Sequence, residues 1–286
     1  MKLIRFLNWV FLLFGLVVLG LTGGYLYLSR SGTITRTIPV IEGINKITSV
    51  VGVQLIQSAS ADERQEVPIL MYHYVREVDS NTDPLGYGLS VSPEIFASHL
   101  AALEQAGYTT ITPQQFLSGD YPDKSLILSF DDGYDDFYSQ ARPLLLEHQM
   151  TAIAFVIYGF LDQENYLSTG QVEELVADGF EIGSHTVSHP NLTSLDDTRL
   201  QQELMESRTA LERLTGKRII AISYPSGEYD ERVLRYANFV GYKFGVTVEN
   251  GLVGSKNELL KLPRVRVGGN ESANDLLAEI ENLRSS

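Results

Sequence analysis

Short apolar runs alternate with amphipathic stretches from Val67 to the end of the chain. The apolar runs have the length of buried strands, and the stretches between them have apolar residues three and four positions apart, as on one face of a helix. The expected strands are 68–71, 126–130, 152–157, 180–183, 219–223, 243–248 and 265–267. The expected helices are 93–107, a short one from 112, 136–148, 171–178, 196–214, 231–239 and 273–283. This alternation predicts an α/β protein with a parallel sheet, open or closed into a barrel, and functional loops at the carboxyl ends of the strands.

The beginning of the chain has a different pattern. Residues 6–28 are almost continuously apolar, and as a helix they would extend roughly 34 Å, which matches the core of a bilayer. No small-x-small cleavage site follows, so we expect an uncleaved transmembrane signal anchor over residues 1–28. Residues 29–66, rich in Ser, Thr, Gln and Val, are expected to form a linker or stalk, with a membrane-surface helix as the alternative. The folded domain is then expected over 67–286.

Charge and cysteine content narrow the function classes. The chain has 22 Lys and Arg against 36 Asp and Glu, and residues 62–286 alone carry a net charge of −18. The sequence has no block of Lys and Arg that could bind along a phosphate backbone, so nucleic acid is not the expected partner. Cysteine is absent, and any metal must therefore bind to His, Asp or Glu. We expect an acidic domain tethered to a membrane outside the cytoplasm, in the periplasm or at the cell surface.

Two acids follow the apolar run at 126–130, where a strand becomes a loop. Asp131 and Asp132 could simply begin a helix, because Asp caps exposed amides, and this is the role expected of Asp135 and Asp136. A glycosidase pair is a weaker interpretation, since adjacent residues leaving a strand point in different directions. One metal ligand beside one free base fits that divergence better.

A second cluster follows the strand expected at 180–183. His185 and His189 are four residues apart, on a loop between Gly183 and Pro190, and can converge on one ion. A pair of surface histidines is the alternative. His73 also follows an expected strand and would reach the same rim. The third loop, 222–230, has a Pro/Gly turn that could aim a backbone N–H at a developing oxyanion.

These motifs resemble those of the polysaccharide deacetylase family, whose members carry a NodB-homology domain. The match runs over about 67–270, with Ser-Phe-Asp-Asp-Gly at 129–133, Ser-His-Thr-Val-Ser-His at 184–189 and Ser-Tyr-Pro-Ser-Gly at 223–227. The resemblance implies a distorted (β/α)7 barrel and one divalent metal ion, with zinc as the first choice. It assigns the general base to Asp131, the metal to Asp132, His185 and His189, and the oxyanion amide to Ser226, beside Tyr224 and Pro225.

The chain also departs from the family pattern. Ser223 stands where the third motif usually has an Arg that supports the base, and Arg264 or Arg266 could supply that charge instead. The usual Asp- and Trp-containing fourth motif and the late acid histidine are not recognisable. The segment 71–75 resembles the start of the family members that de-N-acetylate exported poly-N-acetylglucosamine, which makes His73 the candidate acid.

The resemblance implies a metal-dependent hydrolase that removes N-acetyl groups from N-acetylglucosamine units of an extracellular or cell-wall polysaccharide and releases acetate. In this chemistry Asp131 takes a proton from the attacking water, and His73 protonates the departing amine. Tyrosines could line the sugar groove by stacking: Tyr72, Tyr74, Tyr224 and Tyr229. The alternatives are an O-acetyl polysaccharide esterase and a non-catalytic, membrane-tethered carbohydrate-binding domain.

Overall fold

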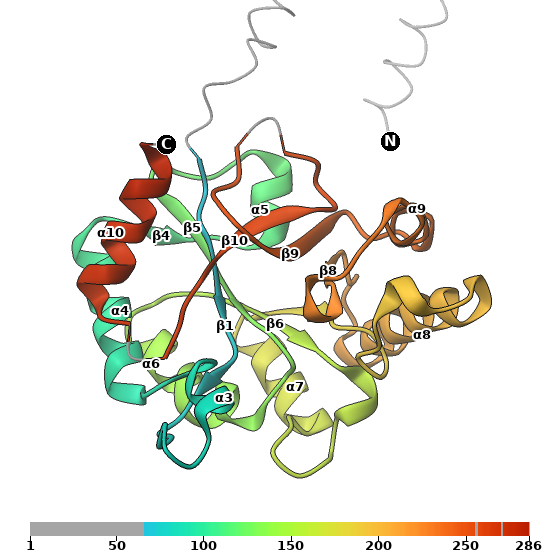
Figure 1. The fold of residues 1–286 in the computed structure, drawn as a ribbon, viewed down its shortest axis with the longest axis horizontal. Helices are drawn as coiled ribbons and strands as arrows, with labels where there is room; N and C mark the ends of the chain where they lie inside the picture. The colour runs from blue at the N-terminus through green and yellow to red at the C-terminus, as the bar shows by residue number, and fades with distance from the viewer. Residues whose placement is uncertain (1–65, 255–256, 270, 286) are drawn as a thin grey trace, which may run out of the picture. The chain divides into compact units, whose positions relative to one another are not determined.

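Seven parallel strands close into a barrel in the computed structural model, which describes residues 66–254, 257–269 and 271–285 (Figure 1). The strands are β1 (Ile69–Tyr72), β5 (Ser125–Phe130), β6 (Ile153–Val156), β7 (Glu181–Ser184), β8 (Ala221–Ser223), β9 (Phe244–Asn250) and β10 (Leu262–Arg266). They pair in the order β1-β10-β9-β8-β7-β6-β5, and β5 pairs with β1 to complete the circuit. The predicted (β/α)7-like barrel is confirmed.

Three two-residue strands complete the sheets and were not predicted, because two residues are too short to show a period. β4 (Thr109–Thr110) pairs with the first two residues of β5. β2 (Tyr74–Val75) and β3 (Ser90–Val91) form a small separate sheet directly after β1. This small sheet carries the chain across the carboxyl end of the barrel before α4 begins.

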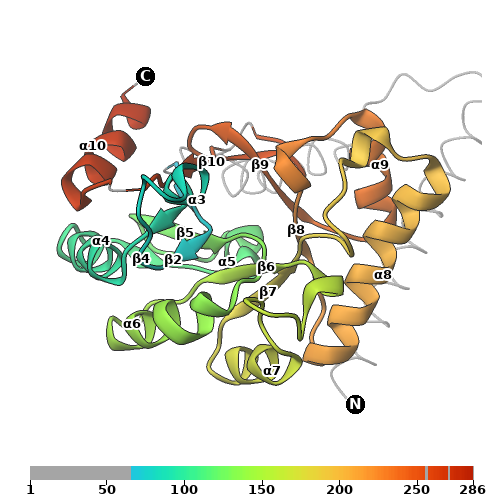
Figure 2. The same cartoon turned by 60° about the horizontal axis from the view of Figure 1, so that its bottom comes forward.

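Most of the helices surround the barrel on the outside, as Figure 2 shows, whereas the short helix α5 (Pro113–Ser118) packs Phe116 into the interior cluster. The longer ones are α4 (Pro93–Gln105), α5 (Pro113–Ser118), α6 (Arg142–Glu147), α7 (Thr169–Ala177), α8 (Asp197–Thr215), α9 (Glu231–Val240) and α10 (Ala273–Arg284). A π-helical turn, η1 (Phe137–Ala141), precedes α6, and single turns are α3 (Pro84–Tyr87), η2 (Tyr158–Phe160), η3 (Leu192–Ser194) and η4 (Pro225–Gly227). Ser, Thr or Asp side chains accept backbone N–H bonds at the starts of α4, α5, α7, α8, α9 and α10, which fixes where those helices begin.

Alternate residues of each strand belong to two different apolar clusters. In β5, Leu126, Leu128 and Phe130 pack in the cluster that includes the helices. Ile127 belongs to the second cluster, which also includes Phe155 of β6 and Val246 of β9. Since side chains alternate across a strand, the second cluster fills the barrel interior. Residues of the same parity at the carboxyl ends of the strands therefore point into the mouth of the barrel.

No helix in the described part of the chain is long and apolar enough to cross a bilayer. The transmembrane anchor predicted for residues 1–28 and nearly all of the linker predicted for 29–66 lie outside the described residues.

Candidate metal and catalytic site

Strand parity gathers the candidate residues at the mouth of the barrel. Asp131 follows Ile127 and Ser129 on the inward side of β5, and His185 follows Gly183 on β7, whose position meets the inward-facing Phe155. The amide of Asp131 donates to the carbonyl of Tyr72 at 3.0 Å, which places His73 beside Asp131. The carboxyl ends of β1, β5, β7, β8 and β10 thus meet at one rim.

Asp132, His185 and His189 form a compact set of donor atoms. Asp132 Oδ1 lies 3.3 Å from His185 Nε2 and 3.7 Å from His189 Nε2, and all three ligand atoms lie within 4.8 Å of one another. Donors bound tetrahedrally to zinc at about 2.0–2.2 Å lie roughly 3.3–3.5 Å apart. Two imidazoles and one carboxylate this close together can hold one divalent ion, and three protein ligands leave a position open.

The second nitrogen of His185 fixes which atom is free to bind a metal. Nδ1 donates to the carbonyl of Ser223 at 2.7 Å, so in the neutral imidazole the lone pair is on Nε2, the atom that faces Asp132. Burial disfavours a charged imidazole, but the hydrogen bond and charge of Asp132 outweigh it and raise the pKa of His185. The reverse holds at Asp132, where burial opposes ionisation but His185 lowers the pKa of the carboxyl. The pKa of His189 is lowered instead, first by burial and then by the charge of His185, so the pocket does not favour protonation of both imidazoles.

Backbone strain is concentrated in these loops. Positive φ angles occur at Asp132 (74°), Thr186 (69°), His189 (56°) and Ser226 (55°), none of which is glycine. Such angles cost of order 1–3 kcal/mol each and persist where the surroundings impose them. At the neighbouring Gly133, also at positive φ, an added Cβ would lie 3.2 Å from the Cα of Val156. Lys124 and Gln149, before β5 and β6, also have positive φ, so this strain is consistent with a functional mouth and is not confined to it.

Glu203 of α8 holds the histidine loop, a role that sequence reasoning missed. Its fully buried carboxylate accepts bonds from the amides of Val187 and Ser188 at 2.8 and 2.9 Å and from the Ser188 hydroxyl at 2.7 Å. Arg199 balances the charge at 2.7 Å. The only sequence signal for this role is that Glu203 lies on the apolar face of the helix. This signal does not predict which loop the residue binds.

Asp131 is ion-paired to Arg264, which the structure selects over Arg266. Two guanidinium nitrogens of Arg264 donate to the two carboxylate oxygens of Asp131 at 2.8 and 2.7 Å, and the Ser223 hydroxyl donates to Oδ2 at 3.2 Å. Burial opposes ionisation of Asp131, but the charge and hydrogen bonds of Arg264 outweigh it and hold its pKa well below the ordinary range. The side chain of Arg266 is exposed.

Pro263 helps to explain how Arg264 reaches this position. The register between β10 and β9 shifts between Leu262 and Arg264, because a proline has no N–H for the ladder. The guanidinium of Arg264 is fully buried, and its Nε donates to the carbonyl of Thr247 at 2.8 Å. Arg264, on the last strand of the barrel, thus supplies the positive charge that the third motif lacks.

His73 lies between β1 and β2 and is partly buried. Burial lowers the pKa of its imidazole, and the charges of Asp131 and Asp132 act in the opposite direction. The structure therefore places the candidate acid within the electrostatic range of both aspartates.

The third loop separates one accessible backbone group from two buried side chains. Ser226 is exposed within η4, and the next two amides donate to Tyr224 and Pro225. Tyr224 is 1% exposed, and its hydroxyl donates to the carbonyl of Leu260 at 2.8 Å. Its ring is therefore a packing residue and is closed to a sugar, contrary to the expected stacking role. The same holds for Tyr72, whose hydroxyl is paired with Nδ1 of His99 at 3.1 Å, whereas Tyr74 and Tyr229 are partly exposed.

The helix-capping role predicted for Asp136 is wrong. Asp136 precedes η1 but makes no cap hydrogen bond, and its Oδ1 is buried without a partner among the described residues. Burial first, with the charge of Asp135, raises the pKa of Asp136 to about 7.

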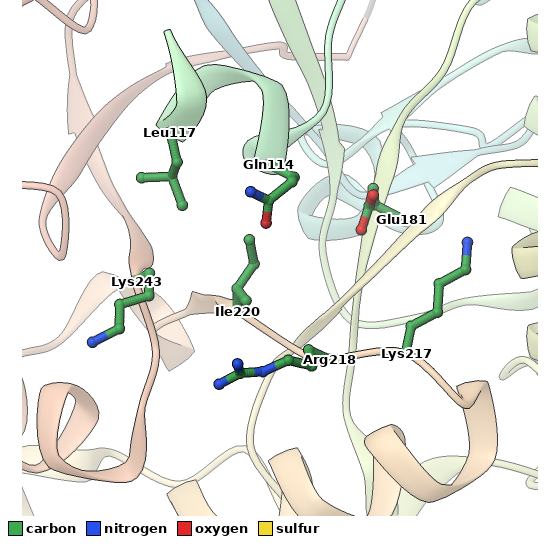
Figure 3. Close-up of a pocket in the computed structure, with 7 residues that line it drawn as sticks. All are labelled: Gln114, Leu117, Glu181, Lys217, Arg218, Ile220 and Lys243. Carbon is green, nitrogen blue, oxygen red and sulfur yellow. The ribbon is translucent and has the colours of Figure 1, made fainter. Parts of the chain in front are cut away.

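A separate pocket of about 420 Å³ lies at the opposite, amino-terminal end of the strands (Figure 3). Glu181 begins β7, and the basic residues Lys217, Arg218 and Lys243 come just before β8 and β9. None of the residues that line this pocket is one of the metal-ligand set, so the pocket is separate from the site at the carboxyl-terminal mouth of the barrel.

A parallel barrel with a carboxylate, two imidazoles and an ion-paired aspartate at its mouth defines a hydrolase of the carbohydrate deacetylase class. The sequence profile described as "Polysaccharide deacetylase" matches residues 118–245. A Bacillus subtilis protein named for the polysaccharide deacetylases, YxkH, is 33% identical over 224 residues, which cover 77% of each chain. The chain belongs to the polysaccharide deacetylase family, as its motifs predict.

Solved structures and a second relative agree with this assignment. The Streptococcus pyogenes deacetylase PplD, solved with acetate, superposes with a TM-score of 0.71 at 31% identity, covering 75% of this chain and 98% of that one. A Bacillus cereus polysaccharide deacetylase gives 0.70 at 30% identity, covering 76% and 69%. The Staphylococcus aureus poly-beta-1,6-N-acetyl-D-glucosamine N-deacetylase is 26% identical over 196 residues, 62% of this chain and 68% of its own.

Proposed function

We propose that this protein is a metal-dependent N-deacetylase of an exported or cell-wall polysaccharide that contains N-acetylglucosamine, and that it releases acetate. One observation carries the proposal: the Asp132, His185 and His189 donor set lies beside an aspartate that is not one of its ligands and is ion-paired to Arg264. A module that only bound sugar would have no use for a buried carboxylate beside a cation site. The name of the Staphylococcus aureus relative supports an N-acetylglucosamine polymer as the substrate class.

Asp132, His185 and His189 would hold the ion, with zinc as the preferred metal because two imidazoles and one carboxylate are a donor set typical of catalytic zinc sites. When bound, a divalent ion supplies a Lewis acid for the acetyl carbonyl and lowers the pKa of water. The hydrogen bond from His185 to Ser223 orients the imidazole before any ion arrives.

Asp131 is the proposed general base. Arg264 and Ser223 occupy three of the approximately four acceptor positions of its carboxylate, which leaves one on Oδ1 for a proton from the attacking water. Arg264 keeps the carboxylate ionised and fixes its orientation. The low pKa of Asp131 also makes an accepted proton easy to release to the leaving group.

His73 and Ser226 complete the proposed machinery. His73, beside Asp131, is the candidate donor of a proton to the departing amine. The backbone N–H of Ser226, an exposed residue of the third loop, is the candidate donor to the oxyanion. We also propose that the domain acts outside the cytoplasm, tethered through the apolar segment 6–28.

The test is acetate release from N-acetylglucosamine oligomers by the full-length protein in detergent, with and without chelator, and by Asp131→Asn. Release that stops with chelator, returns with zinc, and drops at least a hundredfold in Asp131→Asn supports the proposal. Faster release from acetylated xylan would instead show an O-acetyl esterase. Oligomer binding without acetate release under any metal would show a carbohydrate-binding domain.

A further inference from the structure

Three tyrosines form a stacked row next to the proposed metal site. Tyr74 begins β2 directly after His73, Tyr134 is two residues after Asp132, and Tyr166 lies in the loop between η2 and α7. The ring centroids of Tyr74 and Tyr134 are 3.8 Å apart and nearly parallel at 20°. Those of Tyr134 and Tyr166 are 5.1 Å apart at 31°. We call these three residues the tyrosine column.

The backbone holds this column firmly. Tyr134 and Tyr166 form an isolated antiparallel bridge. The amide of Asp135 donates to Asn165 at 3.0 Å, and the amide of Leu167 donates to Gly133 at 2.9 Å. Two loops that are distant in sequence are therefore joined directly beside Asp132, and their rings cannot move independently.

The ring faces of Tyr74 are covered. The guanidinium of Arg76 lies 3.6 Å from the centre of the Tyr74 ring, and its Nε donates to the Ser90 hydroxyl at 3.2 Å. At the other end of the column, Phe160 and Tyr166 make a T-shaped contact with ring centroids 5.0 Å apart. Because Tyr134 and Arg76 occupy its faces, Tyr74 can meet a ligand only through its ring edge and hydroxyl group.

The phenol hydroxyls are hydrogen-bonding groups close to the metal-site carboxylate. A phenol hydroxyl both donates and accepts, and those of Tyr74 and Tyr166 pair with the hydroxyl of Tyr134. All three side chains are partly exposed. A row of phenols beside the site suits a polyhydroxylated chain.

We propose that the tyrosine column is a saccharide subsite, which binds the sugar units next to the one that loses its acetyl group through its phenol hydroxyls. The inference rests on the proposed function and adds where the polymer lies: along β2, the loop after β5 and the loop after β6. It assigns to Tyr74 a contact different from the expected stacking, since both faces of that ring are already covered.

The test replaces hydroxyls and keeps rings. Tyr74→Phe, Tyr134→Phe, Tyr166→Phe and the triple variant are assayed with an N-acetylglucosamine pentamer and with 4-nitrophenyl acetate as a small ester. Each lost hydrogen bond should lower kcat/KM for the pentamer relative to the ester by about two- to tenfold, mainly through KM. Tyr138→Phe is the matched control, because its hydroxyl binds Glu174 at 2.5 Å on the outer helices, and it should leave the ratio unchanged.

A triple variant with an unchanged pentamer-to-ester ratio would overturn the inference. The affinity of the pentamer, measured by calorimetry on the full-length protein and the triple variant, separates this inference from the proposed function. If the unsubstituted protein releases no acetate, the proposed function fails. The tyrosine column is then supported by a weaker pentamer affinity in the triple variant and refuted by an equal one.

Discussion

Replacing Arg264 by methionine should show how much the stability of the protein depends on the buried ion pair between Arg264 and Asp131. The guanidinium makes five hydrogen bonds, two to Asp131 and one each to Ser129, Ser223 and Thr247. Methionine fills much of the same space but satisfies none of these acceptors. Asp131, which is only 4% exposed, would remain ionised and unpaired.

Breaking a buried ion pair by removing one partner costs about 3–5 kcal/mol, and we expect Arg264→Met to lose that much free energy of unfolding near pH 8. The loss should depend on pH. In the unsubstituted protein the pKa of Asp131 is lower in the folded state than its ordinary value of 3.8 in the unfolded chain. The ion pair therefore contributes its full stabilisation above pH 3.8. This contribution is lost only as the pH falls toward the folded-state pKa. In Arg264→Met the largest opposing contribution to burial is gone, and the pKa of Asp131 is higher than in the unsubstituted protein. The variant then takes up a proton as pH falls, and its deficit shrinks.

Urea denaturation followed by circular dichroism at about pH 8 and about pH 5.5, both above the isoelectric point of about 4.8, measures this deficit. Arg264→Lys is the control that keeps the charge without the bidentate geometry. Arg264→Met combined with Asp131→Asn removes the stranded charge and should be more stable than Arg264→Met alone near pH 8. Equal deficits at both pH values, with additive effects in the double variant, would refute the reasoning.

Three further substitutions test other parts of the mouth. Ser226→Pro removes the proposed oxyanion N–H and cannot adopt φ 55°, so kcat should fall about 10²- to 10³-fold, whereas Ser226→Gly keeps the N–H and the angle and should keep most activity. Glu203→Gln loosens the loop of His189 and should weaken zinc affinity about 10- to 100-fold by competition with a chromogenic chelator; an unchanged affinity would make Glu203 purely structural. Asp136 holds a proton in the folded state up to about pH 7 that the unfolded chain releases near 3.8, so its contribution to stability is lost as pH rises through that window. Asp136→Asn should therefore be more stable than the unsubstituted protein above pH 7, on the order of 2–4 kcal/mol, and a gain independent of pH would contradict the assignment.

The strands and helices of the barrel could be predicted because their periods are long enough to read. The helix predicted at 231–239 is observed at Glu231–Val240, and the strand predicted at 126–130 at Ser125–Phe130. The two-residue strands β2 to β4 depend on partners far away in sequence, which no local pattern shows. The strand at 265–267 is shifted, since Pro263 hid the start of β10 at Leu262.

The candidate site was more predictable than its supports. Asp132, His185 and His189 follow strands in short motifs, so their convergence followed from the rule that the carboxyl ends of parallel strands meet at one rim. The cation that pairs with Asp131 could be predicted only as either Arg264 or Arg266, because the register shift in β10 decides which of them faces inward. Glu203 and the tyrosine column depend on contacts between separate loops. Asp136 was misassigned because an acid at a helix start usually caps it, whereas this one is buried.

The direction of β1 has a practical consequence. The described chain reaches the barrel at Val67, which bridges to Val253, and β1 then runs from Ile69 toward the rim that carries His73. The described chain therefore enters the barrel at the amino-terminal ends of the strands, across the full depth of the barrel from His73 and the metal-ligand set. A long glycan bound at the mouth would approach the barrel from the end opposite to this entry point.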